Sequence, residues 1–284
     1  MLRLKSIEKC QEVVRAGFQE FFDLCRHNMA HPGDLLLCQQ NAFIYKGYPC
    51  VGMGNEGLDC IPKINSIVYS GIGEITEDNN YFTKYGRAFF NGTSELEKGL
   101  HQEKTTYLNI WENAFFLRVF TQVVRVLNGD NYDWSLNIGK LTPNGKSKHI
   151  REQIVKRLSI SPCFQNIIKT AYVSQIRNAV AHSQYHLIQG GILYDNYQSD
   201  KYANLEGLTF EEWEQKYIYS YFVFRGLFQT LKQIKDEFYI VILKKTIEKG
   251  IPIKVSYDDG KWYETYLYPD EKGERWRFSK NLRC

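Results

Sequence analysis

The sequence predicts a mainly α-helical fold with a less regular, mixed N-terminal segment and a small C-terminal β unit. Over most of the chain, apolar residues recur at three- and four-residue steps, which is the spacing of an amphipathic helix. Between residues 31 and 91, glycine and proline interrupt this pattern, and after residue 250 apolar and polar residues alternate as they do in strands. We therefore expect three regions: residues 1–100, 101–250 and 251–284.

The composition is that of a globular protein and excludes several classes. Of the 284 residues, 43% are hydrophobic and 24% are charged, which argues against a chain that is disordered throughout. The net charge of +4 allows a nucleic-acid partner without requiring one. The seven cysteines are odd in number and form no Cys-x-x-Cys pair, which favours reduced thiols. With a charged N-terminus and no long apolar run, the sequence indicates a cytoplasmic protein without a membrane partner.

The N-terminal region begins with an expected helix over residues 6–28, with Ser6 as its N-cap. Beyond it, the short apolar runs "AFIY" and "SIVYSGI" are typical of strands or ordered loops. The glycine-rich stretch "VGMGNEG" lacks the Lys-Ser/Thr ending of a phosphate loop, so we do not expect it to bind nucleotides.

Two helices are expected in the first part of the central region. The stretch 105–129 is the most apolar helix candidate; a capping box, Ser94 with Glu97, precedes it, and Asn128-Gly129 ends it. A shorter helix over residues 146–160 is strongly basic. Its charges indicate either a solvated face or a surface that contacts phosphates.

The rest of the central region predicts a helix, a hairpin and a second helix. Ser161 is a good N-cap and Pro162 suits the first helical position, so a helix is expected from there to residue 183. Next comes a hairpin turning at Gly190-Gly191. Thr209 and Glu212 form a capping box for the long helix 210–250, which Gly226 is expected to kink or divide.

The C-terminal region predicts a small antiparallel strand unit. Aromatic residues lie among lysines and arginines there, namely Trp262, Tyr263, Trp276 and Phe278. This pattern is typical of a half-buried sheet, and the alternative is a surface that contacts RNA.

The strongest candidate site lies in "SQIRNAVAHSQYHL", residues 174–187. Residues four apart share one side of a helix, so Ser174, Asn178 and His182 form a polar row. Arg177 lies about 100° further round, and its long side chain can reach this row. His transfers protons near neutral pH and Arg stabilises charge on phosphate oxygens, which together suit phosphate chemistry without a metal. The alternative is structural: Arg and His near a helix C-terminus also cap carbonyls.

The segment "IRNAVAHS" resembles the signature of the HEPN superfamily, in which an Arg, usually followed by a polar residue, precedes a His by four to six intervening residues. Here four residues separate Arg177 from His182, and Asn178 follows the Arg. The stretch "WENAFFLR" is similar to the long early HEPN helix, where Glu112 matches the acidic residue that often faces the motif. The resemblance covers residues 105–250 and implies a bundle of about four helices.

The resemblance also implies a function, namely a metal-independent endoribonuclease acting at a composite cleft of a homodimer. His182 would act as general base or acid on the ribose 2′-hydroxyl, Arg177 would stabilise the transition state, and Asn178 and Glu112 would position them. Ser174 belongs to the same row, and His186 at most lines the cleft. The products would be a 2′,3′-cyclic phosphate and a 5′-hydroxyl.

Such a chain would serve in anti-phage defence or in a toxin–antitoxin system, with RNA as substrate and an antitoxin or another defence protein as partner. No cofactor and no metal is expected, because the other histidines have no ligand partner at metal spacing. Two alternatives stay open. One is a non-catalytic HEPN module that binds RNA, a nucleotide or a partner protein, and the other is a purely structural helical protein.

Overall fold

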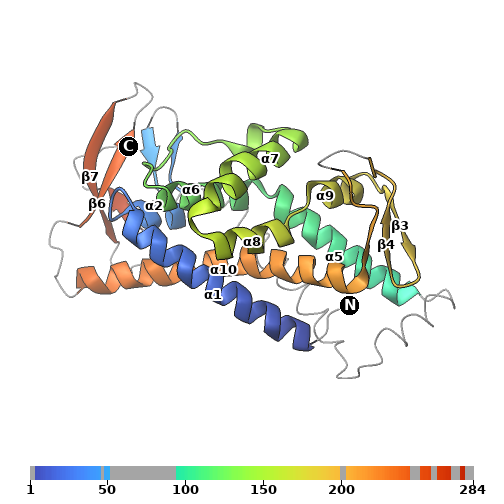
Figure 1. Ribbon diagram of the computed structural model, residues 1–284. Coiled ribbons are helices and arrows are strands. Elements are labelled where there is room, and N and C mark those ends of the chain that lie inside the picture. The colour runs from blue at the N-terminus through green and yellow to red at the C-terminus, as the bar shows by residue number, and fades with distance from the viewer. Residues whose placement is uncertain are drawn as a thin grey trace. The chain divides into compact units, whose positions relative to one another are not determined.

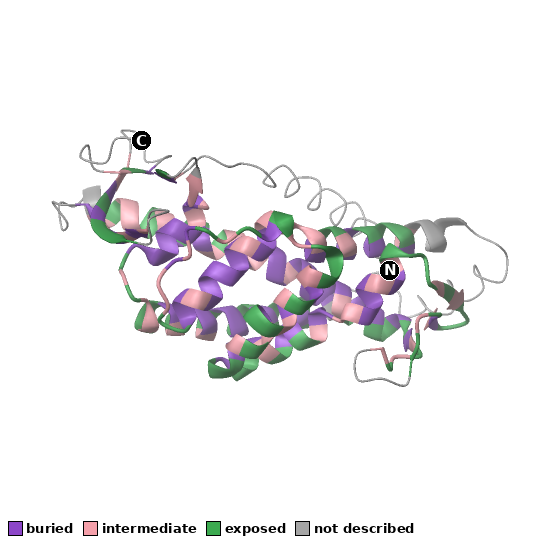
Figure 2. Ribbon diagram, turned by 90° about the horizontal axis from the view of Figure 1, so that it is seen from above, coloured by how far each residue is buried: buried purple, intermediate pink, exposed green. Residues whose placement is uncertain are grey.

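The computed structural model describes residues 4–45, 48–51, 94–198, 203–243, 250–256, 261–269 and 276–278 (Figure 1). These residues are mainly helical, with small antiparallel sheets, which confirms the predicted class. Buried residues run along the helices, as Figure 2 shows. None of the described helices combines the length and the apolar character that a membrane crossing requires.

The chain divides into two compact units, and each is assembled from separate segments. Unit 1 combines residues 1–17, 59–113 and 163–224. Unit 2 combines residues 18–58, 114–162 and 225–284.

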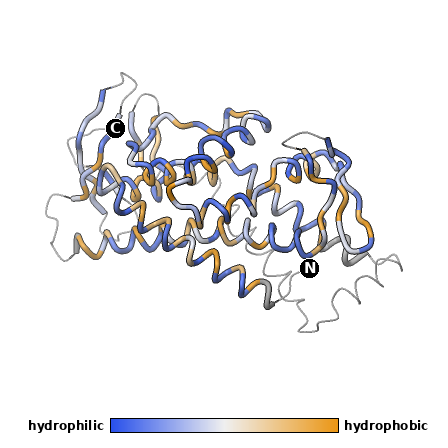
Figure 3. The backbone as a smooth tube through the Cα atoms, in the orientation of Figure 1, coloured by the Kyte–Doolittle hydropathy of each residue, from blue (hydrophilic) through white to orange (hydrophobic). Residues whose placement is uncertain are grey.

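The first helix, α1 (Leu4–Asn28), belongs partly to each unit. Figure 3 shows hydrophobic and hydrophilic stretches alternating along it, as expected for an amphipathic helix. The predicted helix 6–28 is confirmed, but it begins earlier. Ser6 therefore lies inside the helix and is not the N-cap that the sequence suggested.

Unit 1 is built around aromatic side chains from two helices. Its elements, besides the first part of α1, are α5 (Ser94–Glu112), α8 (Pro162–Ala171), α9 (Ser174–Ala181), β3 (Tyr185–Ile188), β4 (Gly191–Tyr194), β5 (Gly207–Thr209) and the first part of α10 (Phe210–Leu243). The indole N–H of Trp111 donates to Ser220 Oγ at 2.9 Å, and that of Trp213 donates to Glu103 Oε2 at 2.7 Å. Both indoles are fully buried, so these bonds join α5 to α10 without leaving a buried donor unpaired.

The long helix α10 begins with the predicted capping box. The backbone N–H of Thr209 donates to Glu212 Oε2 at 2.8 Å, and that of Glu212 donates to Thr209 Oγ1 at 3.2 Å. The helix continues through Gly226 without a division, so the expected division there is wrong. A Cβ atom at Gly226 would lie 2.6 Å from the Phe18 ring, so the glycine permits close packing rather than a break.

Two helices expected as single elements are each interrupted. The stretch 105–129 belongs to α5 and to α6 (Ala114–Leu127), which Asn113 separates, because its N–H bonds to the Ile110 carbonyl in a tight turn. The predicted end is confirmed, since Gly129 has a φ of +72°. The helix expected from Ser161 to residue 183 is divided between α8 and α9. The Ser161 hydroxyl donates to Glu20 Oε1 at 2.9 Å.

Unit 2 also has an aromatic core, in which the Phe21 and Phe120 rings meet edge to face with centroids 6.5 Å apart. Its elements, besides the rest of α1 and α10, are α2 (Asp34–Gln40), β1 (Phe43–Tyr45), β2 (Tyr48–Cys50), α6, η1 (Ile138–Lys140), α7 (Pro143–His149), η2 (Ile150–Val155), η3 (Lys156–Ile160), β6 (Ile251–Ser256), β7 (Trp262–Pro269) and β8 (Trp276–Phe278). The run "AFIY" forms β1 as predicted, whereas "SIVYSGI" and most of "VGMGNEG" lie outside the described residues.

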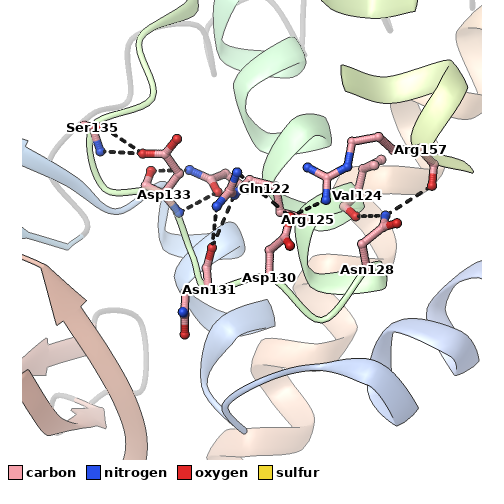
Figure 4. Close-up of polar contacts among 9 residues, drawn as sticks. All are labelled: Gln122, Val124, Arg125, Asn128, Asp130, Asn131, Asp133, Ser135 and Arg157. Atoms are coloured by element: carbon pink, nitrogen blue, oxygen red, sulfur yellow. Dashed lines mark hydrogen bonds and ion pairs between the residues drawn. The ribbon is translucent and has the colours of Figure 1, made fainter. Parts of the chain in front are cut away.

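The expected basic helix 146–160 is part of a longer helical run that begins at Pro143. Thr142 caps it by accepting a hydrogen bond from the Gly145 N–H at 3.1 Å, and its middle is a π-helical turn. A polar network fixes the loop after α6 to this run (Figure 4). In it, Arg157 pairs with Asp130, and the Asn128 amide donates to the Arg157 carbonyl at 3.1 Å.

The C-terminal residues form the antiparallel sheet β6-β7-β8, as predicted. Trp276 is buried and the Phe278 ring lies 6.3 Å from that of Trp134, whereas Trp262 and Tyr263 are exposed. The half-buried sheet is therefore confirmed, and contact with RNA stays a prediction.

Candidate functional site

The site helix α9 owes its direction to a break in the chain. Val173 is extended, with φ −128° and ψ 117°, so α8 ends before it and α9 begins after it. The Val173 N–H donates to the Tyr107 hydroxyl oxygen at 3.1 Å, and the Tyr172 ring packs 4.9 Å from that of Trp111. Two aromatic residues of α5 therefore set where α9 starts.

Three of the expected site residues come together between α5 and α9. Arg177 Nη2 forms an ion pair with Glu112 Oε1, and Arg177 Nη1 donates to Asn178 Oδ1. Glu112 is the last residue of α5, and the two helices pack against each other (Figure 1). The sequence predicted that Glu112 faces the motif, and in the structure it does.

The three side chains differ in how far they are exposed to solvent. The Arg177 side chain is only 1% exposed and that of Glu112 is 25% exposed, while Asn178 is half-buried. A buried cation needs a partner, and Glu112 supplies one. Arg177 is therefore covered within the single chain, and Asn178, to which it donates, is the more exposed of the two.

His182 is the exposed member of the motif. It caps the C-terminal end of α9, where its backbone N–H donates to the Asn178 carbonyl at 3.0 Å. Its ring makes no hydrogen bond or ion pair with any residue that the structure describes. An exposed imidazole at a fixed helix end is accessible to a substrate.

Among the described residues, no hydrogen bond or ion pair joins Ser174 or His186 to this cluster. Ser174 is the first residue of α9, and in the described part of the chain its hydroxyl has no hydrogen-bond partner. His186 lies on the hairpin, as predicted, in strand β3. Its Nδ1 is 2.9 Å from Oδ1 of Asp195, a residue that sequence reasoning missed.

The pairing of His186 with Asp195 had a signal in the sequence. The predicted turn at Gly190-Gly191 would pair His186 directly with Asp195. The structure turns one residue earlier, at Gln189-Gly190, where Gly190 has a φ of +87°, and His186 lies opposite Leu193. Asp195 is two residues further on, which places both side chains on one face of the hairpin. The predicted turn therefore already implied this neighbour.

A second missed group, Gln175, anchors α9 to the loop after the hairpin. The Gln175 amide donates to the Leu205 carbonyl at 2.7 Å and accepts from the Leu205 N–H at 2.8 Å. Its own carbonyl accepts from the Asn196 amide at 3.0 Å. Gln175 was predicted only to face inward, and no pattern in the sequence indicates its partners.

Buried apolar and aromatic side chains neighbour the cluster in the chain, among them Trp111, Tyr172, Ile176 and Ala179. Burial raises the pKa of Tyr107 well above its usual range, so its hydroxyl stays neutral and remains an acceptor for Val173. Among the residues that the structure describes, no cluster of His, Cys, Asp and Glu could hold a metal ion. The groups at hand are an exposed imidazole, an amide, and a covered guanidinium paired with a carboxylate, which suit proton transfer and hydrogen bonding.

Comparison of the chain with protein-family models, with curated proteins and with solved structures found no match.

Proposed function

We propose that the chain is a metal-independent endoribonuclease of the HEPN type. The observation that carries this proposal is the grouping at α9, where Arg177 is bound to both Glu112 and Asn178 and His182 is exposed at the end of the same helix. A helix end with a purely structural role would not require these residues in the order of the HEPN motif.

In the proposed reaction, RNA supplies its own nucleophile. The His182 imidazole accepts the proton of a ribose 2′-hydroxyl, and the 2′-oxygen attacks the adjacent phosphorus atom. The bond from phosphorus to the 5′-oxygen breaks and that oxygen takes up a proton, which leaves a 2′,3′-cyclic phosphate and a 5′-hydroxyl. No metal enters this sequence of steps.

Because Arg177 is buried, in this proposal it acts on the substrate only through Asn178 and Glu112. Its guanidinium holds the Asn178 amide oxygen and the Glu112 carboxylate, so the Asn178 amide nitrogen is oriented for a phosphate oxygen. Arg177 is then a positioning residue in the protomer, whereas His182 contacts the substrate. A homodimer would bring two such sets to one cleft, in a system for phage defence or of the toxin–antitoxin kind.

The test is cleavage of labelled RNA in EDTA by the wild type, by His182→Ala and by His27→Ala. His27 is an exposed histidine of α1 and serves as the matched control. We expect cyclic phosphate ends from the wild type and from the control, and a loss of about 100-fold or more for His182→Ala. RNA with a 2′-deoxy residue at the scissile position should resist cleavage.

Two results would refute the nuclease. One is a folded wild-type protein that cleaves neither single-stranded nor structured RNA, and the other is a His182→Ala variant that cleaves at the wild-type rate. RNA bound but not cut by either protein would support the alternative, a non-catalytic HEPN module that binds RNA, a nucleotide or a partner protein. The covered guanidinium of Arg177 is the observation that favours this alternative.

A further inference from the structure

A second exposed imidazole lies close to the motif in sequence and is paired with a carboxylate. His186 Nδ1 lies 2.9 Å from Asp195 Oδ1, and the two side chains are 56% and 49% exposed. The register of β3 with β4 places Asp195 diagonally opposite His186 on one face of the hairpin. A carboxylate at Nδ1 sets the orientation of the ring and leaves Nε2 without that bond.

Backbone hydrogen bonds fix this pair to the end of α9. The Gln184 N–H donates to the Ala179 carbonyl at 2.9 Å, and the Asp195 N–H donates to the Gln184 carbonyl at 3.0 Å. The Asn196 amide then bonds to the Gln175 carbonyl on α9. The hairpin end that carries the His186–Asp195 pair is therefore held against the helix that carries His182.

The chain itself limits how far apart the two histidines can lie. His186 follows His182 by four residues. Even a fully extended chain of this length spans at most about 14 Å between the Cα atoms. Two side chains that extend from such positions can both contact one nucleotide linkage.

Cleavage by a 2′-hydroxyl requires two proton transfers, and His182 supplies one group for them. We propose that His186, oriented by Asp195, is the second: the general acid that protonates the departing 5′-oxygen. In this step His182 takes the proton of the 2′-hydroxyl, the phosphorus–O5′ bond breaks, and the Nε2–H of protonated His186 passes its proton to O5′. Nδ1 keeps its hydrogen bond to Asp195 throughout. The proposal rests on the nuclease function above.

The exposure of the pair makes the role testable by substitution. An exposed ion pair contributes little to stability, so replacing either partner leaves the fold intact. A role in the chemistry would instead appear in the rate of cleavage. Asp195→Asn keeps the shape of the side chain and loses the carboxylate, so it tests orientation separately from proton transfer.

The decisive experiment compares ordinary RNA with RNA in which sulfur replaces the 5′-oxygen of the scissile linkage. A thiolate leaves without taking up a proton, so this substrate does not need a general acid. We expect His186→Ala to be slowed about 100-fold on ordinary RNA and to cleave the sulfur substrate within about 10-fold of the wild-type rate. His182→Ala should be slow on both substrates, and Asp195→Asn should lie between the wild type and His186→Ala on ordinary RNA.

The possible failures can be told apart. Wild-type rates for His186→Ala on ordinary RNA would overturn the proposal and leave the nuclease standing. An equal loss on both substrates would also overturn it, because a role in binding or structure gains nothing from sulfur. If the wild type cleaves neither substrate, the nuclease itself is refuted and this inference with it. His27→Ala again provides the exposed-histidine control.

Discussion

At the scale of single residues, Asp34 is a buried group that couples folding to pH. It is the first residue of α2 and is 1% exposed, and its Oδ2 accepts a hydrogen bond from the His31 N–H at 2.9 Å. Burial raises the pKa of Asp34 to about 6, although this hydrogen bond and the charges of His31 and Lys254 act in the opposite direction. Between about pH 4 and pH 6, the folded protein therefore holds a proton on Asp34 that the unfolded chain has already released.

This difference predicts the pH dependence of stability. Because the pKa of Asp34 is higher in the folded state, the contribution of Asp34 to the free energy of unfolding should fall as the pH rises from about 4 to about 6 and stay level above that. Asp34→Asn removes this slope. At pH 7.5 the variant should be more stable than the wild type by up to about 3 kcal/mol, and near pH 4 the difference should vanish. Urea unfolding across this pH range measures both effects.

Asp236→Asn, at an exposed position of α10, is the control and should leave the slope unchanged. If Asp34→Asn keeps the slope of the wild type, or is less stable at pH 7.5, the carboxyl of Asp34 is not the group responsible.

The site residues show how far reasoning from the sequence reaches at this scale. The meeting of Arg177 with Asn178 and Glu112 agrees with the expectation stated for these residues, in which Glu112 was placed opposite Arg177 by resemblance alone. The burial of Arg177 could not be predicted. A long cationic side chain can lie either in solvent or against a carboxylate, and only the packing of the folded chain decides between the two. The contact of Asp195 with His186 could also be predicted, but only by working out which residues face each other across the hairpin.

At the scale of elements, the break before α9 depends on one hydroxyl of α5. Tyr107→Phe removes the acceptor that satisfies the Val173 N–H, and leaves the ring in place. An unpaired, partly buried donor costs about 1–3 kcal/mol, so we expect a loss of stability in that range. Thermal or urea unfolding of the variant measures this loss. Tyr197→Phe, at an exposed tyrosine, should have no effect, and an unaltered Tyr107→Phe protein would mean that the break does not need this bond.

Helix ends and turns could be predicted where short-range chemistry decides them. The Thr209–Glu212 capping box follows from residues a few positions apart, and so does the hairpin, although its turn lies at Gln189-Gly190, one residue before the predicted position. The helix breaks at Asn113 and Val173 could not be predicted, because the spacing of apolar residues continues through both positions. Gln175 and Ile176 illustrate this. They were expected on the inward side of one long helix, and they are buried even though the helix is divided before them.

At the scale of the whole molecule, neither unit is a continuous stretch of chain. The expected helical domain 101–250 leaves out Phe21, which packs against Phe120, and Lys254, whose carbonyl accepts the Trp134 indole N–H at 3.0 Å. A fragment of residues 101–250 would therefore expose parts of its core. We expect it to lack the cooperative unfolding transition of the full chain in circular dichroism. A sharp transition in this fragment would instead support the domain boundaries expected from the sequence.

Because each unit combines early and late segments of the chain, its core can be completed only after the late segments have been synthesised. Arg26 of α1 pairs with Glu237 of α10, a residue 211 positions later. At about 5–20 residues per second, a ribosome needs on the order of 10–40 s to travel between them. During that time the Phe18 ring of α1 lacks Gly226 of α10, against which it packs in the folded chain. We expect the nascent chain to depend on a chaperone until its later segments emerge.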